Sequence, residues 1–318
     1  LLGIPVALGS ATPSLESWRN ALSGKYLLAR LTARIDSRPL PDVQIVDMRE
    51  EQKAGNKSSI SRALREEITL RFHRREKSIV LINRRGFATG IRCSNCGQTL
   101  ACPDCSAALV YHAARRLAVC HLCGQERIVL QHCPHCGSED IMYTGRGTER
   151  IESELANAFE EAGIIRMDSD TTQAHDSHFR LLEEFRSGEA SILLGTQMVG
   201  KGLDIPEVTL VGVIAADSAL ALPDFRAAEK TFQLITQVAG RAGRGEAPGK
   251  VIVQALMPEH YAVAAACRHD YETFAAVELE SRGEVDFPPF TRLILIEMTA
   301  ENSSALMAKA SDAANYLT

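Results

Sequence analysis

The chain has 318 residues and a formal net charge of -5 at pH 7, with 45% hydrophobic and 24% charged residues. The length accommodates two domains, or one large domain with an insertion, and the composition is that of a globular protein. The acidic balance excludes indiscriminate binding of nucleic acid, so any DNA contact must come from local basic patches. The sequence has no run of about 18 apolar residues, so no membrane-spanning segment is expected.

The N-terminal segment predicts the end of one domain. An apolar run at residues 4–8 leads into the sequence GSATP at residues 9–13, and a helical pattern starts at Leu15. Small residues with two hydroxyls at a strand end suit a relay between sites, although Thr12-Pro13 is also an ordinary helix start. Pro39-Leu40-Pro41 marks the join to the next domain. The chain begins and ends inside predicted elements, so we expect a piece of a longer protein.

Short apolar runs then alternate with amphipathic stretches, which predicts a parallel sheet covered by helices on both faces. The predicted strands lie at residues 43–46, 79–82, 164–167, 192–194, 208–214 and 251–255, and the predicted helices at 62–72, 150–159, 179–185 and 227–238. A further boundary is expected at Asp286–Phe290, where Phe-Pro-Pro-Phe breaks helix propensity, and residues 293–298 are predicted to begin a new strand.

A basic run lies between Arg71 and Arg92. It holds seven lysines and arginines and a single acid, Glu76. Two interpretations stay open: a local patch for nucleic acid, or a solvated helix end followed by a turn.

Eight of the nine cysteines form four Cys-x-x-Cys pairs, which are Cys93/Cys96, Cys102/Cys105, Cys120/Cys123 and Cys133/Cys136. Each pair can offer two thiolates to one ion, so four pairs predict two tetrahedral four-sulfur sites for structural zinc. The alternatives are iron at the same ligands and a disulfide framework. The disulfide framework is disfavoured because no secretory segment precedes the block and the chain looks intracellular.

The cysteine block interrupts the alternation after the strand at 79–82 and the turn at 83–87, so it is predicted to be an insertion into the α/β domain. The ends of an insertion must lie close together. This favours a nested pairing, in which the first and last Cys-x-x-Cys pairs (the outer knuckles) share one ion and the two inner pairs share the other. The inner four cysteines then have the spacing C-x2-C-x14-C-x2-C of a zinc ribbon. Sequential pairing, and ligation by His121 or His135, are the alternatives. Cys267, in an Ala-rich helix, is interpreted as a small core residue.

The sequence QVAGRAGR at residues 237–244 ends a predicted helix and enters a glycine-rich turn. Arg241 and Arg244 are three residues apart, hence on one face of a helical turn. Two guanidinium groups presented together can grip a transferring phosphoryl group. A capped helix end with ordinary surface arginines is the alternative.

Residues 195–202 read GxxxxGKG after a strand, one residue short of a phosphate-binding P-loop. Gly202 stands where a P-loop needs Ser or Thr to place a hydroxyl on magnesium, and the following Leu-Asp-Ile-Pro leaves no room for a long helix. We expect instead a strand end that exposes its backbone. Thr196 would then face a nucleic-acid phosphate and Asp204 a nucleotide ribose.

Together, GSATP, the NRRGF turn at 83–87, GTQMVGKGLDIP at 195–206 and QVAGRAGR resemble, in that order, the later motifs of superfamily-two DNA helicases. The eight-cysteine insertion directly after NRRGF is similar to that of the primosomal replication-restart helicases. TGRGTERIE at 144–152, RMDSDTT at 166–172 and Pro288-Pro289 also match that family. The resemblance covers essentially the whole chain.

The resemblance implies a RecA-like parallel-sheet helicase lobe with an inserted small zinc-binding module and partial flanking domains. The implied segments are 1–38, the end of the first lobe; 39–92, the first part of the second lobe; 93–137, the zinc module; 138–285, the rest of the second lobe; and 286–318, the start of a C-terminal domain.

The resemblance also implies roles for single residues and for cofactors. It assigns phosphate sensing in catalysis to Gln237, Arg241 and Arg244, ATP binding to Gly202 and Asp204, coupling of ATP to DNA to Ser10 and Thr12, and DNA contact to Thr196 and Arg85. It implies two Zn²⁺ at the eight cysteines in the nested arrangement, and ATP with Mg²⁺. The phosphate loop and acidic box would lie upstream of GSATP.

The implied function is part of an ATP-dependent 3′-to-5′ DNA helicase that recognises stalled or forked DNA and restarts replication by primosome assembly. The implied partners are forked and single-stranded DNA, single-stranded DNA-binding protein, primosome proteins and the replicative helicase loader, in the bacterial cytoplasm near the nucleoid and without a membrane. These 318 residues alone are expected to hydrolyse no ATP, because one wall of the nucleotide cleft is missing.

Two alternative functions belong to other classes. One is a non-enzymatic zinc-ribbon scaffold that binds DNA or protein on a degenerate helicase fold. The other is a redox chaperone with cysteine-rich repeats, which is more distant because such repeats need a regular CxxCxGxG spacing.

Overall fold

The structure is a computed structural model that divides the chain into two compact units, residues 1–86 with 147–291 and residues 87–146 with 292–318. It describes residues 4–31, 40–83, 91–93, 96, 100–104, 109–112, 117–120, 123–128, 132–139, 141–143, 147–167, 177–188, 190–196, 205–221, 224–243, 248–294, 296, 298 and 303–317. No helix in this described part of the chain is both long and apolar enough to cross a lipid bilayer.

The first unit is built on a six-stranded sheet in which every pairing is parallel, in the order β1-β11-β10-β2-β9-β8. The strands are β1 (Asp42–Asp47), β2 (Lys77–Ile82), β8 (Ile164–Met167), β9 (Ile192–Gly195), β10 (Val208–Ile214) and β11 (Lys250–Ala255). The central strands β2 and β10 are buried along their whole length, as expected for a sheet covered on both faces. The predicted parallel α/β class is confirmed.

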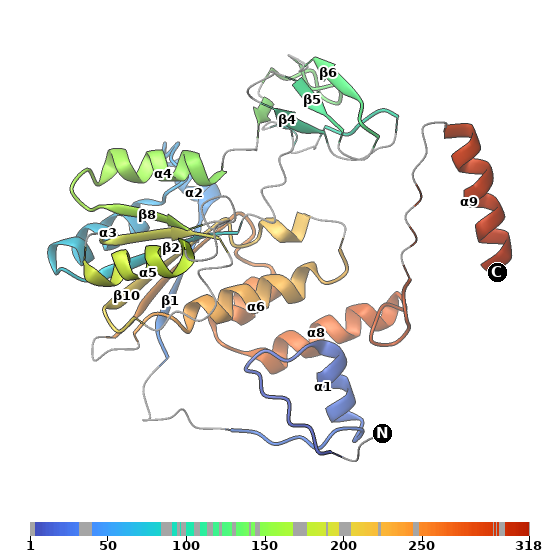
Figure 1. Cartoon of the computed structure of the whole chain (residues 1–318), viewed down its shortest axis with the longest axis horizontal. Helices are drawn as coiled ribbons and strands as arrows, with labels where there is room; N and C mark the ends of the chain where they lie inside the picture. Colours follow the sequence, from blue (N-terminus) through green and yellow to red (C-terminus); the bar gives the residue numbers. More distant parts are fainter. Residues whose placement is uncertain are drawn as a thin grey trace. The chain divides into compact units, whose positions relative to one another are not determined.

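Helices cover this sheet (Figure 1). The helices of this unit are α1 (Leu15–Leu22), α2 (Met48–Lys53), α3 (Arg62–His73), α4 (Gly147–Ala158), α5 (Ser177–Ser187), α6 (Ala227–Ala239), α7 (Tyr261–Cys267) and α8 (Tyr271–Glu284), with a 3-10 turn at Ser218–Ala221. On one face, alternate strand residues form a single core with Phe185 of α5 and Phe232 of α6. On the other face α3 lies close to β10, because a side chain at Gly212 would meet Leu64 Cδ1 at 2.7 Å.

The basic run is partly used inside the fold. Arg71 is buried between Glu67 and Glu76, with nitrogen–oxygen distances of 3.2 and 3.4 Å. Lys77 is also buried, and its ammonium group donates to the carbonyls of Phe185 and Arg186 (2.9 Å for Arg186), which belong to the last turn of α5. Burial lowers the pKa of Lys77. The interpretation as a nucleic-acid patch is therefore wrong for Arg71 and Lys77.

Helix α1 packs onto the helices that follow β10. Leu15 is fully buried in the same core as Phe232, and the Trp18 ring meets the edge of Tyr271 with a centroid distance of 5.3 Å. The Tyr271 hydroxyl donates to the Pro13 carbonyl at 2.8 Å. The segment directly after GSATP is thus attached to α6 and α8.

The second unit contains two small antiparallel sheets. β3 (Ile91–Cys93) pairs with β7 (Ile141–Tyr143), and β4 (Val110–His112), β5 (Leu117–Val119) and β6 (Glu126–Ile128) form the other sheet. Because β3 enters the cysteine block and β7 leaves it, their pairing confirms that the ends of the insertion lie together. The same unit ends in α9 (Ser303–Leu317). The strand predicted at 293–298 is wrong: the described residues 293, 294, 296 and 298 form none.

We predict that His260 makes stability depend on pH. Its Nδ1 atom accepts from the Ala262 amide at 3.2 Å and so caps α7 in the neutral form only. Burial lowers the pKa of His260 despite the nearby carboxylates of Glu278, Asp217 and Glu259. The unfolded chain therefore takes up this proton first as pH falls below about 6.5, and stability is lost towards the lower pKa of the folded state.

The test compares urea midpoints at pH 7.5 and 5.5 for the wild type and for His260→Asn, which keeps a cap acceptor that does not titrate. Loss of a cap is worth about 0.5–2 kcal/mol, so the wild type should lose up to that much more than the variant on acidification. Proton-dependent metal loss affects both proteins alike and cancels in the comparison. An equal loss in both proteins would contradict the prediction.

Candidate metal centres and nucleotide site

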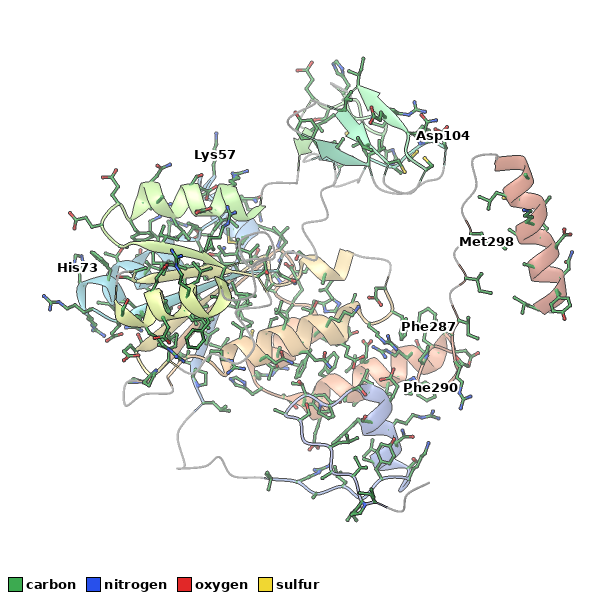
Figure 2. All side chains as sticks on the ribbon, viewed as in Figure 1. Lys57, His73, Asp104, Phe287, Phe290 and Met298 are labelled. Carbon is green, nitrogen blue, oxygen red and sulfur yellow. The ribbon has the colours of Figure 1, made fainter. Side chains whose placement is uncertain are left out.

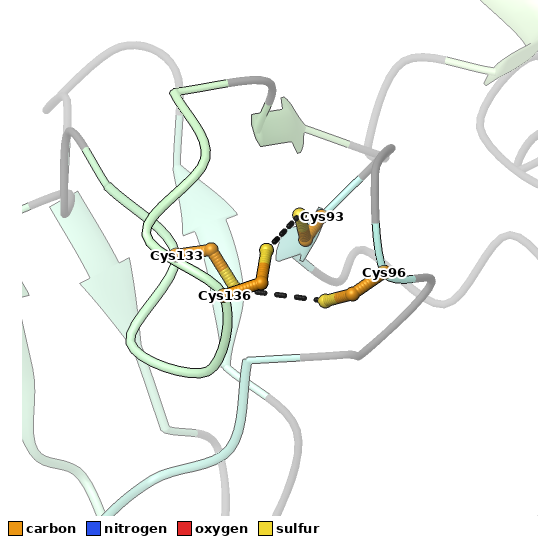
Figure 3. A group of neighbouring side chains, drawn as sticks. All are labelled: Cys93, Cys96, Cys133 and Cys136. Carbon is orange, nitrogen blue, oxygen red and sulfur yellow. Dashed lines mark hydrogen bonds between the residues drawn. The ribbon is translucent and has the colours of Figure 1, made fainter.

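The outer cysteines form a four-sulfur cluster (Figure 3). The sulfur atoms of Cys93, Cys96, Cys133 and Cys136 all lie within 4.8 Å of one another. The Sγ–Sγ distance is 3.6 Å for Cys93 and Cys136 and 3.7 Å for Cys96 and Cys133. A tetrahedron with zinc–sulfur bonds of about 2.3 Å has edges of about 3.8 Å, so the cradle has the size that zinc requires. The same distances exclude disulfides, whose sulfurs lie about 2.05 Å apart.

The inner cysteines follow the same plan. Cys102, Cys120 and Cys123 form a second cluster, with 3.6 Å between the sulfurs of Cys102 and Cys123. Cys105, the expected fourth ligand, and His121 lie outside the described residues. His135 is exposed and belongs to neither cluster; only its backbone amide approaches a sulfur, Cys133 Sγ at 3.4 Å. The grouping of the described sulfurs is that of the nested pairing.

Two knuckles have the same backbone turn, which explains how their thiolates converge. The Cys120 amide donates to Gln125 O and the Gly124 amide to Cys120 O, both at 2.8 Å. The corresponding bonds at the other knuckle join Cys133 to Ser138 and Gly137 to Cys133, at 2.8 and 2.9 Å. Gly124 and Gly137 have φ angles of 76° and 73°, a left-handed conformation that favours glycine. The glycine after each pair therefore lets the chain turn back over its metal site.

The cysteine clusters suit a structural metal and not a catalytic one. Four protein sulfurs close a tetrahedral coordination sphere, so the outer cluster leaves no position for water or substrate. Small apolar side chains surround the inner cluster, where Leu100, Leu109 and Ala118 pack with Cys102 and Cys120. Cys267 is a member of neither cluster and packs against the core of the first unit, as predicted. Burial raises the pKa of its thiol to about 12, which keeps it protonated and unreactive.

Polar residues gather at the carboxyl edge of the parallel sheet. Thr196 directly follows β9 and is buried, and Asn83 directly follows β2. Asn83 ties β2 to β10, since its side-chain amide donates to Ala216 O at 3.1 Å and its carbonyl accepts from Ser218 Oγ at 3.0 Å. Arg85, two residues after Asn83 in the sequence, lies outside the described residues.

Asp217 lies at the same carboxyl edge of the sheet, and the sequence analysis did not single it out. It is buried after β10, and its carboxylate accepts from the amides of Leu256 and Met257 at 2.8 and 2.6 Å, which ties β10 to the end of β11. A lone acid three residues after a mostly apolar strand is the sequence signal that could have found it.

The segment at residues 240–249, after α6, is called the arginine loop. Its described residues lie at the opposite edge of the sheet, where the parallel strands begin. Gln237 is exposed in the last turn of α6, and Arg241 is partly exposed just beyond it. The Gly243 amide donates to the carbonyl of Val208, the first residue of β10, at 3.2 Å. Ile205, three residues before β10, is buried there. The loop with Arg241 thus adjoins the residues that follow Asp204, while Gly202, Asp204 and Arg244 themselves lie outside the described residues.

Two glycines close the base of the arginine loop. A Cβ on Gly249 would lie 2.4 Å from Ala242 C and Gly243 N, and a Cβ on Gly243 would lie 2.4 Å from Gly249 N. Gly243 also has a φ of 69°. The two arms of the loop therefore touch backbone to backbone. The Gly249 carbonyl in turn accepts from the Asp42 amide at 3.1 Å, which fixes this base to β1.

The two hydroxyl residues of GSATP lie directly before α1. The Thr12 amide donates to Ser10 Oγ at 3.0 Å, and Thr12 is buried while Ser10 is exposed. The Leu15 amide, three residues later, donates to Glu229 Oε1 of α6 at 3.3 Å. The structure therefore brings this segment to the first turn of the helix whose far end carries Gln237 and Arg241.

Two protein-family models match the chain. The model of the helicase conserved C-terminal domain matches residues 128–246, and that of the PriA DNA helicase Cys-rich region domain matches residues 102–127. The first range contains Gln237, Arg241 and Arg244, and the second contains the described cysteines of the inner cluster.

Curated relatives match over nearly the whole chain. Replication restart protein PriA of Bacillus subtilis is 46% identical over 313 residues, covering 98% of this chain and 39% of the relative. The proteins of the same name from Synechocystis and Treponema pallidum are 45% and 41% identical, covering 94% and 91% of this chain and 37% and 43% of the relatives. The chain thus spans about two fifths of the length of the curated relatives it matches.

Solved structures of helicases show weaker similarity. RecG bound to a three-way DNA junction matches with a TM-score of 0.45 and 13% identity, over 95% of this chain and 29% of that chain. S. cerevisiae Dbp5 bound to RNA and ADP BeF3 matches with a TM-score of 0.38 and 12% identity, over 86% and 53%.

We predict two zinc ions per chain, one in each cluster. Cys120→Ser should lose one ion and keep the outer cluster filled, and Cys267→Ser, the matched control, should keep both. Structural zinc contributes about 10–16 kcal/mol of apparent binding free energy in small peptides, so the wild type is expected to hold both ions through purification. Elemental analysis of the purified proteins is the measurement. One metal equivalent in the wild type, a dominant iron signal, or loss of both ions from Cys120→Ser would reject the assignment.

We also predict that the glycine base of the arginine loop accepts no side chain. Gly249→Ala should lower the free energy of unfolding by about 1–3 kcal/mol, because the added methyl overlaps backbone atoms that cannot turn away. Gly240→Ala is the matched control, since its methyl would meet only atoms at 3.5 Å or more. It should be neutral or stabilising by up to about 1 kcal/mol. Equal effects of the two substitutions in urea unfolding would contradict the prediction.

Proposed function

Because the chain belongs to the PriA family of replication restart proteins, we propose that it supplies the second motor lobe and the zinc module of an ATP-dependent 3′-to-5′ DNA helicase. The parent protein would recognise stalled or forked DNA and restart replication by primosome assembly. The observation that carries this proposal is the Arg241 loop, which is fixed to the amino edge of a parallel sheet by the bond from Gly243 to Val208.

The nucleotide side of the lobe is formed by the arginine loop. Arg241 and Arg244 would bind the transferring phosphoryl group of ATP, where a guanidinium offers permanent charge and paired donors. Gln237 would orient the phosphate from the last turn of α6, and Gly202 and Asp204 would line the rest of the nucleotide. The loop is anchored at its glycine base, so Arg241 would be held in place before ATP arrives. Magnesium and the phosphate loop would belong to the other lobe.

The DNA side is the carboxyl edge of the same sheet. Thr196 and Arg85 would contact the DNA backbone there, and Asn83 and Asp217 would hold the strand ends in register. Ser10 and Thr12 would couple the two sides as the cleft opens and closes around ATP. Support comes from the parallel order of the strands, which puts Thr196 and Asn83 at one edge of the sheet and the described part of the Arg241 loop at the other.

The zinc module would hold two structural Zn²⁺ ions at the eight cysteines. Zinc at these sites supplies a rigid cross-link and no chemical step. The module presents a surface for DNA or for protein partners, among which we propose single-stranded DNA-binding protein, primosome proteins and the replicative helicase loader. The protein would act in the bacterial cytoplasm, near the nucleoid.

The test replaces Arg241 and Arg244 together by Ala in the full-length parent protein. Arginines that act on a transferring phosphoryl group are worth about 10³- to 10⁵-fold in rate, so DNA-stimulated ATP hydrolysis and fork unwinding should fall by that order. Binding of forked DNA should persist. Arg268→Ala, at an exposed helix end outside the motifs, is the matched control and should keep full activity.

Three outcomes would count against this proposal. Full unwinding by the double variant would remove the role of the arginines. DNA-stimulated hydrolysis by the isolated 318 residues would show that the second wall of the cleft is not needed. A wild-type parent that binds forked DNA but hydrolyses no ATP would favour the non-enzymatic scaffold.

A further inference from the structure

A buried cluster of charges joins α6 and α8. Arg282 of α8 lies between Glu229 of α6 and Glu278 of α8, at 2.9 Å from Glu229 Oε2 and 2.8 Å from Glu278 Oε1. The side chains of all three residues are at most 6% exposed. A further Arg282 nitrogen donates to the Pro288 carbonyl at 3.2 Å, and the Tyr261 hydroxyl donates to Glu278. None of these residues belongs to a helicase motif named above.

The cluster carries one negative charge too many. Two carboxylates face one guanidinium, and an uncompensated charge in such a buried place is strongly unfavourable. The amino end of α1 supplies part of the compensation, because the Leu15 amide donates to Glu229 Oε1 at 3.3 Å. The side-chain amide of Gln233, within α6 itself, donates to the same oxygen at 3.4 Å. The first amides of a helix carry partial positive charge, so the surplus on Glu229 attracts the start of α1.

Other contacts fix α1 to the same body. The Tyr271 hydroxyl bonds to Pro13 O, and Arg19 donates to Pro289 O at 2.6 Å while its guanidinium lies 4.3 Å from the centroid of the Phe290 ring. Phe287 and Phe290 lie beyond the end of α8 (Figure 2). The residues directly after Thr12 are therefore held from α6, α8 and the turn that follows α8.

Helix α6 connects this cluster with the arginine loop. Glu229 lies in its first turn, and Arg241 comes twelve residues later, a separation of about 18 Å along a helix. Phe232, Ile235 and Val238 are buried between these points, so packing in the core keeps α6 rigid. The first turn of α6 is bonded to the segment that follows Ser10 and Thr12, and Arg241 follows its last turn.

We propose that Glu229 is a positioning residue that sets the GSATP segment relative to Arg241 and thereby couples DNA binding to ATP hydrolysis. This inference rests on the proposed motor function. Glu229 touches neither ATP nor DNA; it acts through the Leu15 amide on one side and through α6 on the other. Removing its charge should leave both binding sites intact and loosen the connection between them.

The experiment is Glu229→Gln in the full-length parent protein. Couplings of this kind change rates by about tenfold, so DNA stimulation of ATP hydrolysis should fall by about that factor. The KM for ATP, the affinity for single-stranded DNA and the content of two zinc ions should not change. Glu16→Gln is the matched control, because it makes the same charge change at the exposed Glu16–Arg226 contact of the same two helices, 3.5 Å apart. It should keep full stimulation.

A second, milder variant tests the same connection in case Glu229→Gln fails to fold. Tyr271→Phe removes one hydroxyl and no charge, and with it the bond to Pro13 O, so it should lower DNA stimulation in the same direction but less. Hydrogen exchange of the Leu15 amide should become faster in Glu229→Gln and stay unchanged in Glu16→Gln. This measurement needs no ATP hydrolysis, so it decides the positioning role even if the parent proves inactive.

Two results would overturn the inference. Full DNA stimulation in both Glu229→Gln and Tyr271→Phe would show that the contact transmits nothing. Glu229→Gln could instead lower basal and DNA-stimulated ATP hydrolysis by the same factor and leave hydrogen exchange of the Leu15 amide unchanged. That result would show that Glu229 contributes only to the stability of the fold. A wild-type parent without DNA-stimulated hydrolysis would instead reject the motor function, and the exchange measurement would still decide whether Glu229 holds α1.

Discussion

The common direction of the six strands is the constraint on which the rest of the structure depends. Parallel strands place every carboxyl end at one edge and every amino end at the other. Thr196 and Asn83 therefore gather at one edge, and the loop of Arg241 lies at the other, beside the start of β10. In the motor proposed above, this arrangement would keep the DNA contact and the nucleotide contact apart, and α6 would connect the two.

The cysteine module obeys a different constraint, because an insertion must begin and end at one place. The pairing of β3 with β7 and the outer cluster both satisfy it, since each joins the first part of the module to the last. A four-sulfur cradle needs little apolar core, which suits a segment too short to bury one. The host strand β2 is consequently unaffected by the insertion and stays buried in full.

Sequence analysis succeeded where the signal is local. The alternation of apolar runs predicted the parallel sheet, and the spacing of the cysteine pairs predicted the grouping of the described sulfurs. It failed for Arg71, which looked like a surface charge, because the burial of its pairs with the nearby Glu67 and Glu76 is not visible in the sequence. It also failed for Lys77, because its partners at the end of α5 are distant in the sequence. The Glu229–Arg282 pair was invisible for the same reason, since 53 residues separate its members. The strand predicted at 293–298 rested on apolar content alone, without a pairing partner.

The arginine loop is closed at its base by a backbone contact between Gly243 and Gly249, and this contact does not depend on any side chain. The contact is made by backbone atoms of the two glycines, and the Gly243 amide and the Gly249 carbonyl extend it to Val208 and Asp42. The base of the loop is therefore attached to β10 and β1 through main-chain groups. A substitution at either glycine would push the two arms apart, so the strictest steric demand falls on residues that have no side chain at all.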